Sequence, residues 1–513
     1  MSRFISRRRF LEDSLLSITA VAGAAYAASV TPVAAQQSAV AASDKIGVAI
    51  VAAGGRAGEH RNYFKGNSQC AILYLVDPDA KKMPDRLIDE IAVSQGGIKP
   101  QSIPDMRKAF DDKSVDVVSI ATCNHWHTLA SVWAVQAGKH VYVEKPGSHN
   151  IHEGQALIAA SKKYNRVVQI GTQCRSNPSN INAVAFIREG GIGEVKFSRG
   201  LCYKRRPAIG ALGDYPIPSS VDYDVWSGPA PIKLLTRPGF HYDWHWQRLY
   251  GNGDSGNQGP HQFDIARWHL GVERFPNAII TYGGRLGYDK ANKENDPNYI
   301  DAGDTANTEV SIFDFGDKCM VFETRGLETP PLRIPHAPEG DKGAGVGVGV
   351  ITYGSKGYVV QSEYGYSAAY DLEGNRIKEF RGGGNHFGNF LDAVAKGDPS
   401  AVNADAACGA LSSGLAHLGN ISYYLGEKNK VPASEIKSAL KAIKSLDNDD
   451  ETVDRTVAHL EASKVELDKT PLSMGPLLTF NPETKQIVGN AEANAMLTRE
   501  YRAPYVVPKP EDV

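Results

Sequence analysis

A strand, a glycine-rich turn, a helix and a second strand open the folded part of this chain, and they constrain its fold more than any other feature. Residues 45–51 (KIGVAIV) form a short apolar run, and residues 71–76 (AILYLV) form a second one that ends at Asp77. The turn between them is followed by residues with helical spacing. Parallel strands joined by a helix make a βαβ unit, so we expect an α/β fold that begins with a parallel sheet.

The same alternation continues as far as residue 171. Further strands are expected at 115–121, 140–143 and 167–170, and helices at about 127–137 and 153–163. Continuous Val/Ile strands separated by helices are typical of a parallel sheet that is covered on both faces. After residue 171 the chain changes to aromatic-rich loops and strands of alternating polarity, which predict a second, α+β domain with one face of its sheet packed.

The turn after the first strand has the composition of a dinucleotide-binding turn. Its register is that of GxGxxG, and it contains Ala53, Gly54, Gly55, Arg56 and Gly58. Ala53 stands where the first glycine is usual. Gly55 would let the backbone approach a pyrophosphate, and Gly58 would let the helix pack on the sheet with its first amides directed at the phosphates. The alternative is an ordinary structural turn.

Asp77 strengthens the dinucleotide interpretation because it ends the next strand, 24 residues after Ala53. A carboxylate at this place accepts hydrogen bonds from ribose hydroxyls and repels a 2′-phosphate. The sequence therefore favours NAD over NADP. Lys81 and Lys82 follow closely and leave NADP open as the second choice.

A lysine stands at the carboxyl end of another expected strand, in residues 141–146 (VYVEKP). Ligands of open α/β sheets bind at this end of the strands, so Lys145 is a candidate site residue. Pro146 fixes the local backbone and ends the strand. Taken alone, the tripeptide Glu144-Lys145-Pro146 is equally compatible with a lysine exposed on the surface after an edge strand.

Three motifs in order give the chain a family resemblance. They are residues 122–127 (TCNHWH), 137–146 (AGKHVYVEKP) and 171–175 (GTQCR). Together they resemble the Gfo/Idh/MocA oxidoreductases, over about residues 45–426. The resemblance implies a Rossmann domain and then an α+β domain with a large mixed, mostly antiparallel sheet, whose open face often mediates oligomerisation. It also places the active site between the two domains.

The resemblance further implies roles for single residues. Lys145 matches the lysine that contacts the reacting sugar hydroxyl near the nicotinamide, and His261, in residues 256–264 (GNQGPHQFD), matches the acid/base position. The family commonly has Asp where this chain has Asn257, which cannot accept a proton. Cys123 likewise replaces the usual proline. We therefore expect Lys145 and His261 to carry protons, since hydride removal from an alcohol needs a base and a donor that holds the oxygen.

Two larger sets of residues complete the expected site, and no metal ligands are among them. The cofactor set is Ala53, Gly54, Gly55, Arg56, Gly58, Asp77, Thr122, Asn124, His127, Glu144, Lys145 and Gln173. The substrate set is Arg175, Tyr203, Lys204, Tyr242, Trp244, His245, Asn257 and His261. Residues 203–206 (YKRR) and 240–246 (FHYDWHW) enter it because such groups stack on sugar faces and bind hydroxyls. A packed core between domains would have the same composition.

The first 35 residues have the features of an export signal. Residues 6–11 (SRRRFL) precede a mildly apolar run, and residues 32–35 (PVAA) supply the small side chains that a signal peptidase needs before Gln36. This segment resembles a twin-arginine signal, so we expect the export machinery as a partner and a periplasmic location. A retained N-terminal anchor is the alternative. Because twin-arginine substrates fold before export, the nucleotide is expected to be held tightly.

The domains expected from these features are a signal at 1–35, an NAD(P)-binding Rossmann domain at 44–171, a substrate and oligomerisation domain at 172–426, and a helical extension with a tail at 427–513. A net charge of −2 gives no basic footprint for nucleic acid, and six cysteines without a CxxC pair indicate neither zinc nor a disulfide framework.

The leading functional hypothesis is an exported NAD(P)-dependent oxidoreductase, a homo-oligomer, acting on a sugar, polyol or sugar derivative. A redox-neutral glycosidase that oxidises, eliminates and returns the hydride is the second hypothesis. A periplasmic sugar-binding protein on a retired dehydrogenase scaffold is the third.

Overall fold

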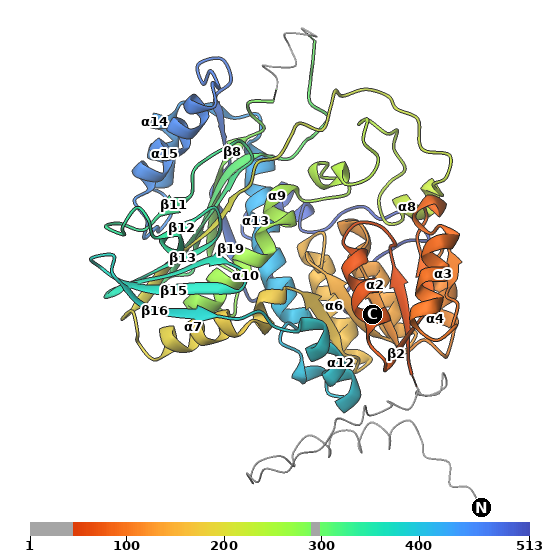
Figure 1. Ribbon diagram of the computed structural model, residues 1–513. Helices are drawn as coiled ribbons and strands as arrows, with labels where there is room; N and C mark the ends of the chain where they lie inside the picture. The colour runs from red at the N-terminus through yellow and green to blue at the C-terminus, as the bar shows by residue number, and fades with distance from the viewer. Residues whose placement is uncertain (1–44, 289–297) are drawn as a thin grey trace, which may run out of the picture.

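The computed structural model describes residues 45–288 and 298–513, so the export signal expected over residues 1–35 lies outside the described residues. Two sheets organise the described chain. A parallel sheet of six strands lies on one side and a mixed sheet of twelve strands on the other, with α6, α10 and α13 between them (Figure 1). The expected fold class, a Rossmann-like sheet followed by a mostly antiparallel one, is confirmed.

The first sheet has the strand order β3-β2-β1-β4-β5-β6, with every pairing parallel. Its elements are β1 (Ile46–Val51), α2 (Ala57–Gly66), β2 (Cys70–Val76), η2 (Ala80–Lys82), α3 (Asp85–Ser94), β3 (Gln101–Ile103), α4 (Arg107–Asp111), β4 (Val117–Ile120), η3 (Asn124–Trp126), α5 (His127–Gln136), β5 (His140–Glu144), α6 (Ile151–Lys163) and β6 (Val168–Gly171). Strands β2, β1, β4, β5 and β6 are almost completely buried because helices cover both faces. Asn150 caps α6 by accepting a hydrogen bond from the Glu153 amide.

The main path of the second sheet has the order β16-β15-β14-β13-β7-β10-β9-β8-β18-β17, with β19 and β20 attached beside it, and within this sheet only β7 and β10 pair in parallel among the described strands. The elements up to residue 426 are η4 (Gln173–Ser176), α7 (Pro178–Arg188), β7 (Val195–Tyr203), α8 (Tyr223–Ser227), η5 (Asp243–Trp246), α9 (Gly253–Asn257), α10 (Gly259–Leu270), β8 (Ala278–Gly284), β9 (Thr308–Asp314), β10 (Cys319–Arg325), β11 (Leu332–Arg333), η6 (Lys342–Ala344), β12 (Gly345–Val346), β13 (Val348–Gly354), β14 (Gly357–Glu363), β15 (Tyr366–Asp371), β16 (Arg376–Arg381), α12 (His386–Lys396), η7 (Pro399–Ala401) and α13 (Ala406–Gly426). Helices α10 and α13 pack on one face of this sheet.

The segment after residue 426 is not only helical, as expected, but also extends the large sheet. It contains β17 (Lys430–Val431), α14 (Ala433–Leu440), α15 (Asp449–Ala462), β18 (Leu472–Met474), β19 (Leu478–Asn481), β20 (Gln486–Ile487) and α16 (Ala491–Ala495). Both β18 and β19 pair with β8. Tyr505, Val507 and Val513 belong to the core of the first domain, so this segment contacts both sheets.

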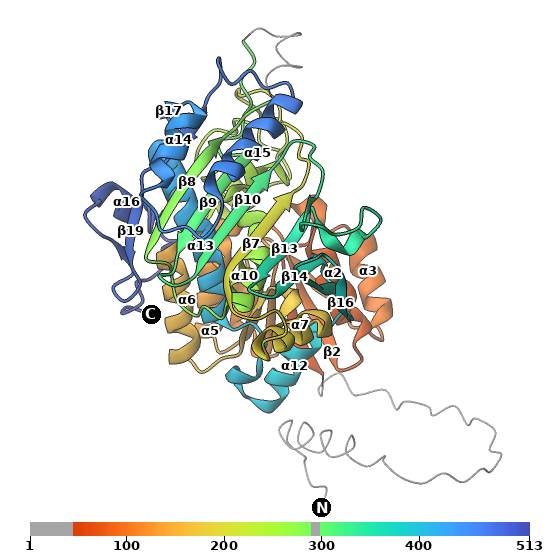
Figure 2. The same cartoon turned by 90° about the vertical axis from the view of Figure 1, so that its left-hand side faces the viewer.

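The face of the large sheet that was expected to be open is covered. Figure 2 shows α14 and α15 in front of strands β8, β9 and β10. Ile436, Val453 and Leu460 pack there against apolar side chains of the sheet. Arg455 of α15 donates to the buried carboxylate of Glu323 at 2.9 Å, and Arg199 of β7 contacts the same carboxylate. The extension therefore occupies the surface that the resemblance assigns to oligomerisation.

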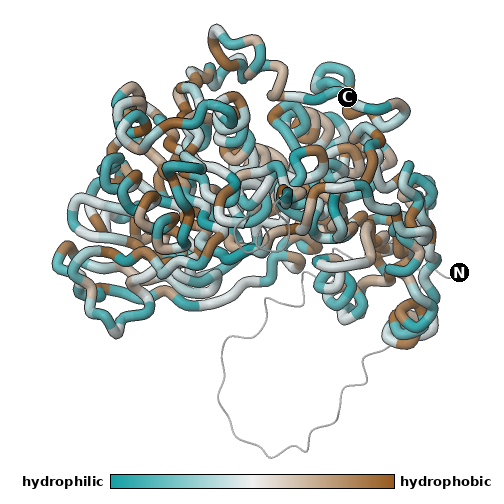
Figure 3. The backbone as a smooth tube through the Cα atoms, turned by 90° about the horizontal axis from the view of Figure 1, so that it is seen from above, coloured by the Kyte–Doolittle hydropathy of each residue, from teal (hydrophilic) through white to brown (hydrophobic). Residues whose placement is uncertain are grey.

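Hydrophobic and hydrophilic residues are interspersed along the backbone, and hydrophobic segments occur both inside the molecule and at its edge (Figure 3). Among the described residues, no helix is both long and apolar enough to cross a membrane. The six cysteines are free thiols.

Candidate functional site

The turn after β1 presents free backbone amides. Gly54, Gly55 and Arg56 donate no hydrogen bond from their amides to any described residue. Gly55 has φ +51° and an added Cβ would meet nothing within 4 Å, so this part of the turn is open on its outer side. Free amides at the start of a helix suit an anion such as a pyrophosphate. The packing reason expected for Gly58 is not found, because a Cβ there would contact only Arg61 Nη2, at 3.7 Å, among described atoms.

Asp77 fixes this turn from the end of β2. Its Oδ2 accepts a hydrogen bond from the Ala53 amide at 2.8 Å, and its Oδ1 accepts one from the Asp79 amide at 2.9 Å. The carboxyl is buried, and burial raises its pKa despite these two bonds. Lys82 runs alongside the turn, with its Cδ 3.3 Å from where a Cβ of Gly54 would lie. Contact between Asp77 and a ribose stays a prediction, which the position at the strand end permits.

Glu144, the last residue of β5, lies within hydrogen-bond distance of three donor side chains. Its Oε1 accepts hydrogen bonds from Arg56 Nε at 3.0 Å and from Gln173 Nε2 at 3.0 Å, and it lies 3.1 Å from His60 Nε2. Burial alone would raise the pKa of Glu144, but the His60 hydrogen bond and the charges of Arg56 and Lys145 hold it well below its ordinary value. Three expected cofactor residues thus bind one another and fix the backbone next to Lys145. His60 was missed, because a histidine within a helix carries no distinguishing sequence signal.

Three residues that we expect at the cofactor lie in or just after the loop that follows β4. Among the described residues, the Thr122 side chain has no hydrogen-bond partner, whereas the side chains of Asn124 and His127 have partners. Thr122 Oγ1 is buried without a hydrogen-bond partner among the described residues. His127 lies between two backbone oxygens, with Nδ1 2.6 Å from that of Pro146 and Nε2 3.0 Å from that of Thr122. Asn124 Nδ2 donates to Asn252 Oδ1 at 3.3 Å. An unpartnered buried hydroxyl beside free amides fits a bound dinucleotide, whereas His127 and Asn124 hold loops in place.

Lys145 and His261 come together across the two domains. Lys145 Nζ donates to the backbone oxygen of Asn257 at 2.6 Å and to its Oδ1 at 3.3 Å. Burial lowers the pKa of Lys145 to about 8. Burial, together with the charge of Lys145, lowers the pKa of His261 to about 3. His261 Nδ1 is buried and has no hydrogen-bond partner in the described chain. At neutral pH the site therefore combines a neutral imidazole with an amine that can lose its proton.

Close packing of α10 on the sheet positions His261. A Cβ at Gly259 would lie 3.1 Å from the rings of Phe263 and Phe322, so a larger residue would require these rings to shift. The ring of Tyr364, from the β14–β15 hairpin, lies 5.2 Å from that of His261. Its hydroxyl accepts a hydrogen bond from Gln258 Nε2 at 2.7 Å. Tyr364 was missed, because it lies far away in the sequence and carries no motif.

A buried ion pair lies near enough to Lys145 for its charges to act on the lysine. Arg206 donates from Nε and Nη2 to Asp254 of α9, the Nη2 to Oδ1 distance being 2.8 Å, and from Nη1 to the Tyr242 hydroxyl at 3.1 Å. The charges of both members of the pair act on the pKa of Lys145. Asp254 was not singled out in the sequence, although it stands one helical turn before Asn257.

Two aromatic residues of the substrate set lie in the same neighbourhood. His245 stacks on Trp244 with 3.6 Å between ring centroids. Burial lowers the pKa of His245 to about 3, and the charges of Lys145 and Arg206 contribute to this. His245 thus lies near Lys145, whereas Trp244 also packs against the buried rings of Trp226, Phe240 and Tyr250, and contact of this stretch with a sugar stays a prediction.

Three residues of the substrate set are placed differently. Arg175 forms a two-pronged ion pair with Asp264, at 2.7 and 2.9 Å, and stacks over Trp268. The Tyr203 hydroxyl donates to Glu323 at 2.6 Å beneath the C-terminal helices, on the face of the sheet opposite to α10, because side chains alternate along β7. Lys204 is exposed, and only its backbone amide has a described partner, the Arg325 oxygen. We therefore leave Arg175 and Tyr203 out of the proposed site.

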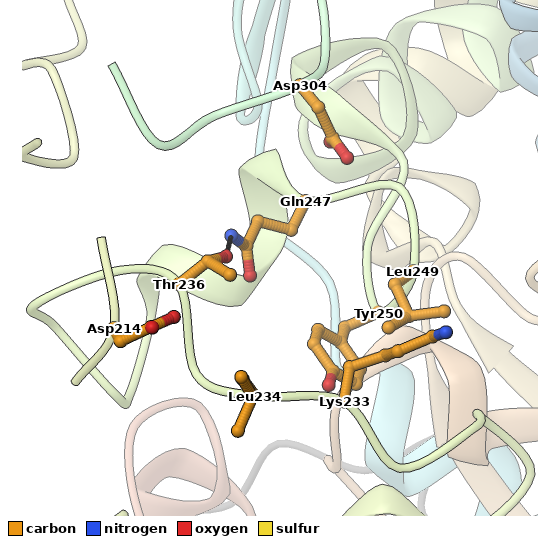
Figure 4. Close-up of a pocket in the computed structure, with 8 residues that line it drawn as sticks. All are labelled: Asp214, Lys233, Leu234, Thr236, Gln247, Leu249, Tyr250 and Asp304. Carbon is orange, nitrogen blue, oxygen red and sulfur yellow. Dashed lines mark hydrogen bonds between the residues drawn. The ribbon is translucent and has the colours of Figure 1, made fainter. Parts of the chain in front are cut away.

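A separate pocket of about 370 Å³ opens between the loops that precede α9 and the loop between β8 and β9 (Figure 4). It is lined by Asp214, Lys233, Leu234, Thr236, Gln247, Leu249, Tyr250 and Asp304. No residue expected at the cofactor or the substrate lines it. No group of three or more His, Cys, Asp or Glu side chains within the described ranges could hold a metal ion.

Comparison with a protein-family model agrees with the geometry of the first domain. Residues 46–172 match the Gfo/Idh/MocA model, described as an oxidoreductase family with an NAD-binding Rossmann fold. Residues 46–172 are thus similar to the NAD-binding Rossmann domain of that family. The match covers about a quarter of the chain and ends before the segment that contains His261.

Two dehydrogenases are similar to part of this chain. A levoglucosan dehydrogenase of Pseudarthrobacter phenanthrenivorans is 30% identical over 181 residues, which are 35% of this chain and 39% of that protein. An inositol 2-dehydrogenase of Corynebacterium glutamicum is 25% identical over 170 residues, 33% of this chain and 48% of that protein. The chain thus spans less than half the length of these relatives.

Solved structures resemble a larger part of the fold. A levoglucosan dehydrogenase in complex with NADH and levoglucosan has a TM-score of 0.50 at 19% identity, and covers 72% of this chain and 95% of its own. An oxidoreductase of Thermotoga maritima has a TM-score of 0.50 at 18% identity, and covers 72% of this chain and 96% of its own. At such identities the likeness concerns the fold alone.

Proposed function

We propose that this protein is an exported, NAD-dependent oxidoreductase that transfers a hydride between the nicotinamide and a CH–OH group of a sugar, polyol or sugar derivative. The observation that carries the proposal is the amine of Lys145, with its lowered pKa, at the carboxyl end of β5 and across from the neutral His261. The family of the NAD-binding domain and the sugar and polyol dehydrogenases similar to it support the substrate class.

The residues toward the nucleotide fit NAD. The amides of Gly54, Gly55 and Arg56 would hold the pyrophosphate, and Thr122 Oγ1 would donate to or accept from the nucleotide. Asp77 would bind a ribose, and the second carboxylate of Asp79 nearby would add repulsion against a 2′-phosphate. When bound, the nicotinamide supplies the hydride acceptor. We therefore propose NAD rather than NADP.

Lys145 is the proton acceptor in this proposal. A general base works best when its pKa is near the working pH, and about 8 for Lys145 meets this condition, whereas about 3 for His261 does not. His261 Nδ1 would instead accept a hydrogen bond from a substrate hydroxyl, and Asn257 would hold the amine in place. Tyr242, His245 and Arg206 are the groups that would contact the remaining hydroxyls.

The test begins with the nucleotide. Purified protein is denatured, the released nucleotide is identified by mass spectrometry, and native protein is incubated with a panel of sugars, polyols and glycosides while absorbance at 340 nm is followed. We expect NAD(H) and net reduction with a free sugar or polyol, and Lys145→Met should lower turnover by orders of magnitude while the protein stays folded.

Other outcomes of this test would support different functions. Bound NAD(H) with glycoside cleavage and no net change in absorbance would support the redox-neutral glycosidase. Protein without nucleotide or turnover, but with sugar binding, would support the binding protein. Wild-type turnover in Lys145→Met would overturn the role given to this residue.

We also propose that residues 1–35 direct twin-arginine export and are then removed. In a double variant with Arg7→Lys and Arg8→Lys, the protein should accumulate in the cytoplasm, whereas the periplasmic wild-type protein should begin at Gln36. Unprocessed protein in the membrane fraction would instead support the anchor.

A further inference from the structure

A long segment before α9 crosses the first domain. We call residues 220–252 the strap; it contains α8 and η5, and in Figure 1 α8 and its loops lie above the helices of the first domain. The strap has an apolar core of its own, in which Trp226, Phe240 and Tyr250 are buried. Arg237 is fully buried among these three rings and donates to the Phe240 oxygen at 2.8 Å. The strap is therefore held in a defined conformation by its own apolar core.

One side of the strap is fastened to the loop after β2. The Ala80 amide donates to the Ser220 oxygen at 3.0 Å, and the Asp222 amide donates to the Pro78 oxygen at 2.8 Å. His241 Nε2 lies 2.8 Å from Asp79 Oδ2, and the Asp79 carboxylate is buried. Backbone and side chain thus join the strap to the three residues that follow Asp77.

The other side of the strap is fastened to the loop after β4. Trp126 Nε1 donates to the Trp226 oxygen at 3.0 Å, and the His125 amide donates to the Tyr250 oxygen at 3.3 Å. Cys123 packs against the apolar core of the strap. These contacts are buried, so the strap is attached to the first domain on this side as well.

The order of the strands shows what lies under the strap. Strand β1 lies between β2 and β4, and the strap joins the loops that follow these two neighbours. In a Rossmann domain the dinucleotide lies across the carboxyl ends of the strands at this crevice, with its adenosine half beside the acidic residue that ends β2. The strap therefore bridges the crevice over the position of the adenosine half.

Residues near the end of the chain hold the strap from outside. Arg502 donates from Nη1 to Asp224 Oδ1 at 2.6 Å and from Nη2 to the Asp224 oxygen at 2.8 Å. The Tyr505 hydroxyl donates to the other oxygen of the same carboxylate at 3.0 Å, and its ring packs against Trp126. Residues 499–505 thus connect the strap to the first domain a third time.

We propose that the strap, with Arg502 as its outer fastening, retains the dinucleotide between turnovers and sets the rate at which it is released. This inference rests on the proposed NAD-dependent function. A nucleotide under a bridge that is attached on both sides leaves only when one attachment opens, so weakening either attachment accelerates release. Arg502 contacts the strap and not the crevice, so its effect on release would have to pass through the strap.

The experiment measures nucleotide exchange in the holoenzyme. The amount of NAD(H) released on denaturation is determined first, and the native protein is then incubated with isotope-labelled NAD, whose uptake is followed over time by mass spectrometry. The variants are Arg502→Ala, which opens the outer fastening, and His241→Ala, which removes the contact with Asp79. The matched control is Arg381→Ala, an exposed arginine paired with Glu379 on β16, away from the strap.

We expect wild-type protein and Arg381→Ala to exchange over many turnover times, and the two strap variants to exchange about tenfold faster or more, since each loses a charge-assisted hydrogen bond. Melting temperatures are measured in parallel, and His241→Ala provides the test if Arg502→Ala does not fold. Tight binding with immediate exchange in the wild type, or equal rates in all variants, would overturn the strap proposal alone. Failure to bind NAD at all would overturn the proposed function together with it.

Discussion

The charge state of Lys145 is the quantity that we expect to control proton transfer, and Asn257 offers a direct way to change it. Asn257 Oδ1 lies 3.3 Å from Lys145 Nζ. In Asn257→Asp a carboxylate would stand at that distance, and at an effective dielectric constant of about 20 the attraction would be about 5 kcal/mol, or about 3 to 4 pKa units. Desolvation of the new carboxylate opposes part of this gain. We therefore expect the pKa of Lys145 to rise from about 8 by about 2 units or more.

The assay is competitive labelling of lysines with acetic anhydride at a series of pH values, with the Lys145 peptide quantified by mass spectrometry. The wild-type midpoint should lie near 8, that of Asn257→Asp in the ordinary lysine range, and that of the uncharged control Asn257→Ala near 8. Since the deprotonated amine accepts the proton, wild-type turnover should rise as the pH rises through 8. A wild-type midpoint in the ordinary lysine range, or an unchanged midpoint in Asn257→Asp, would refute this reasoning.

Four further predictions follow from the described structure. Gly55→Val should weaken NAD binding by about tenfold or more, because φ +51° strains a branched side chain; equal affinity by calorimetry would contradict this. Asp77→Ala should narrow the difference between the dissociation constants for NAD and NADP, and an unchanged ratio would place Asp77 away from the ribose. Leu460→Ala should lower the free energy of unfolding by about 2 to 5 kcal/mol in chemical denaturation, because this residue is fully buried under the sheet; a negligible loss would argue against that packing. Light scattering should give the mass of a monomer, because α14 and α15 cover the expected interface, and a dimer with crosslinks on β8 to β10 would disprove this.

The positions of the strands in the first domain could be predicted well because most of these strands are continuous runs of apolar residues. Strands β1, β2, β4, β5 and β6 begin and end within a few residues of their expected places, since a run of Val and Ile buried on both faces needs no periodicity to be recognised. Strand β3 (Gln101–Ile103) was not predicted. It has three residues, two of them exposed, at the edge of the sheet, and so carries neither composition nor pattern.

Residues of the candidate site could be predicted only where they stand in a recognisable sequence motif. Lys145, Asn257 and His261 stand in motifs, and the structure brings all three together. Tyr203 and Arg206 show where prediction from the sequence fails. Both lie in the same basic stretch, but only Arg206 lies near Lys145. Tyr203 is the last residue of β7 and faces the covered side of the sheet, whereas Arg206 lies beyond the strand and turns to Asp254. Without the register and end of β7, the sequence could not separate them.

The packing of residues 505–513 on the first domain has a consequence for the order of folding. Tyr505 lies against Trp126 and Trp133, and Val513 is buried in the same core, so the outer surface of α5 and α6 closes only with residues made several hundred positions later. Contacts of such long range form late. Until the end of the chain has been synthesised, Trp126 and Trp133 would therefore remain without the cover of Tyr505, and the strap would lack its contact with Arg502. That interval is when a nucleotide would enter most freely.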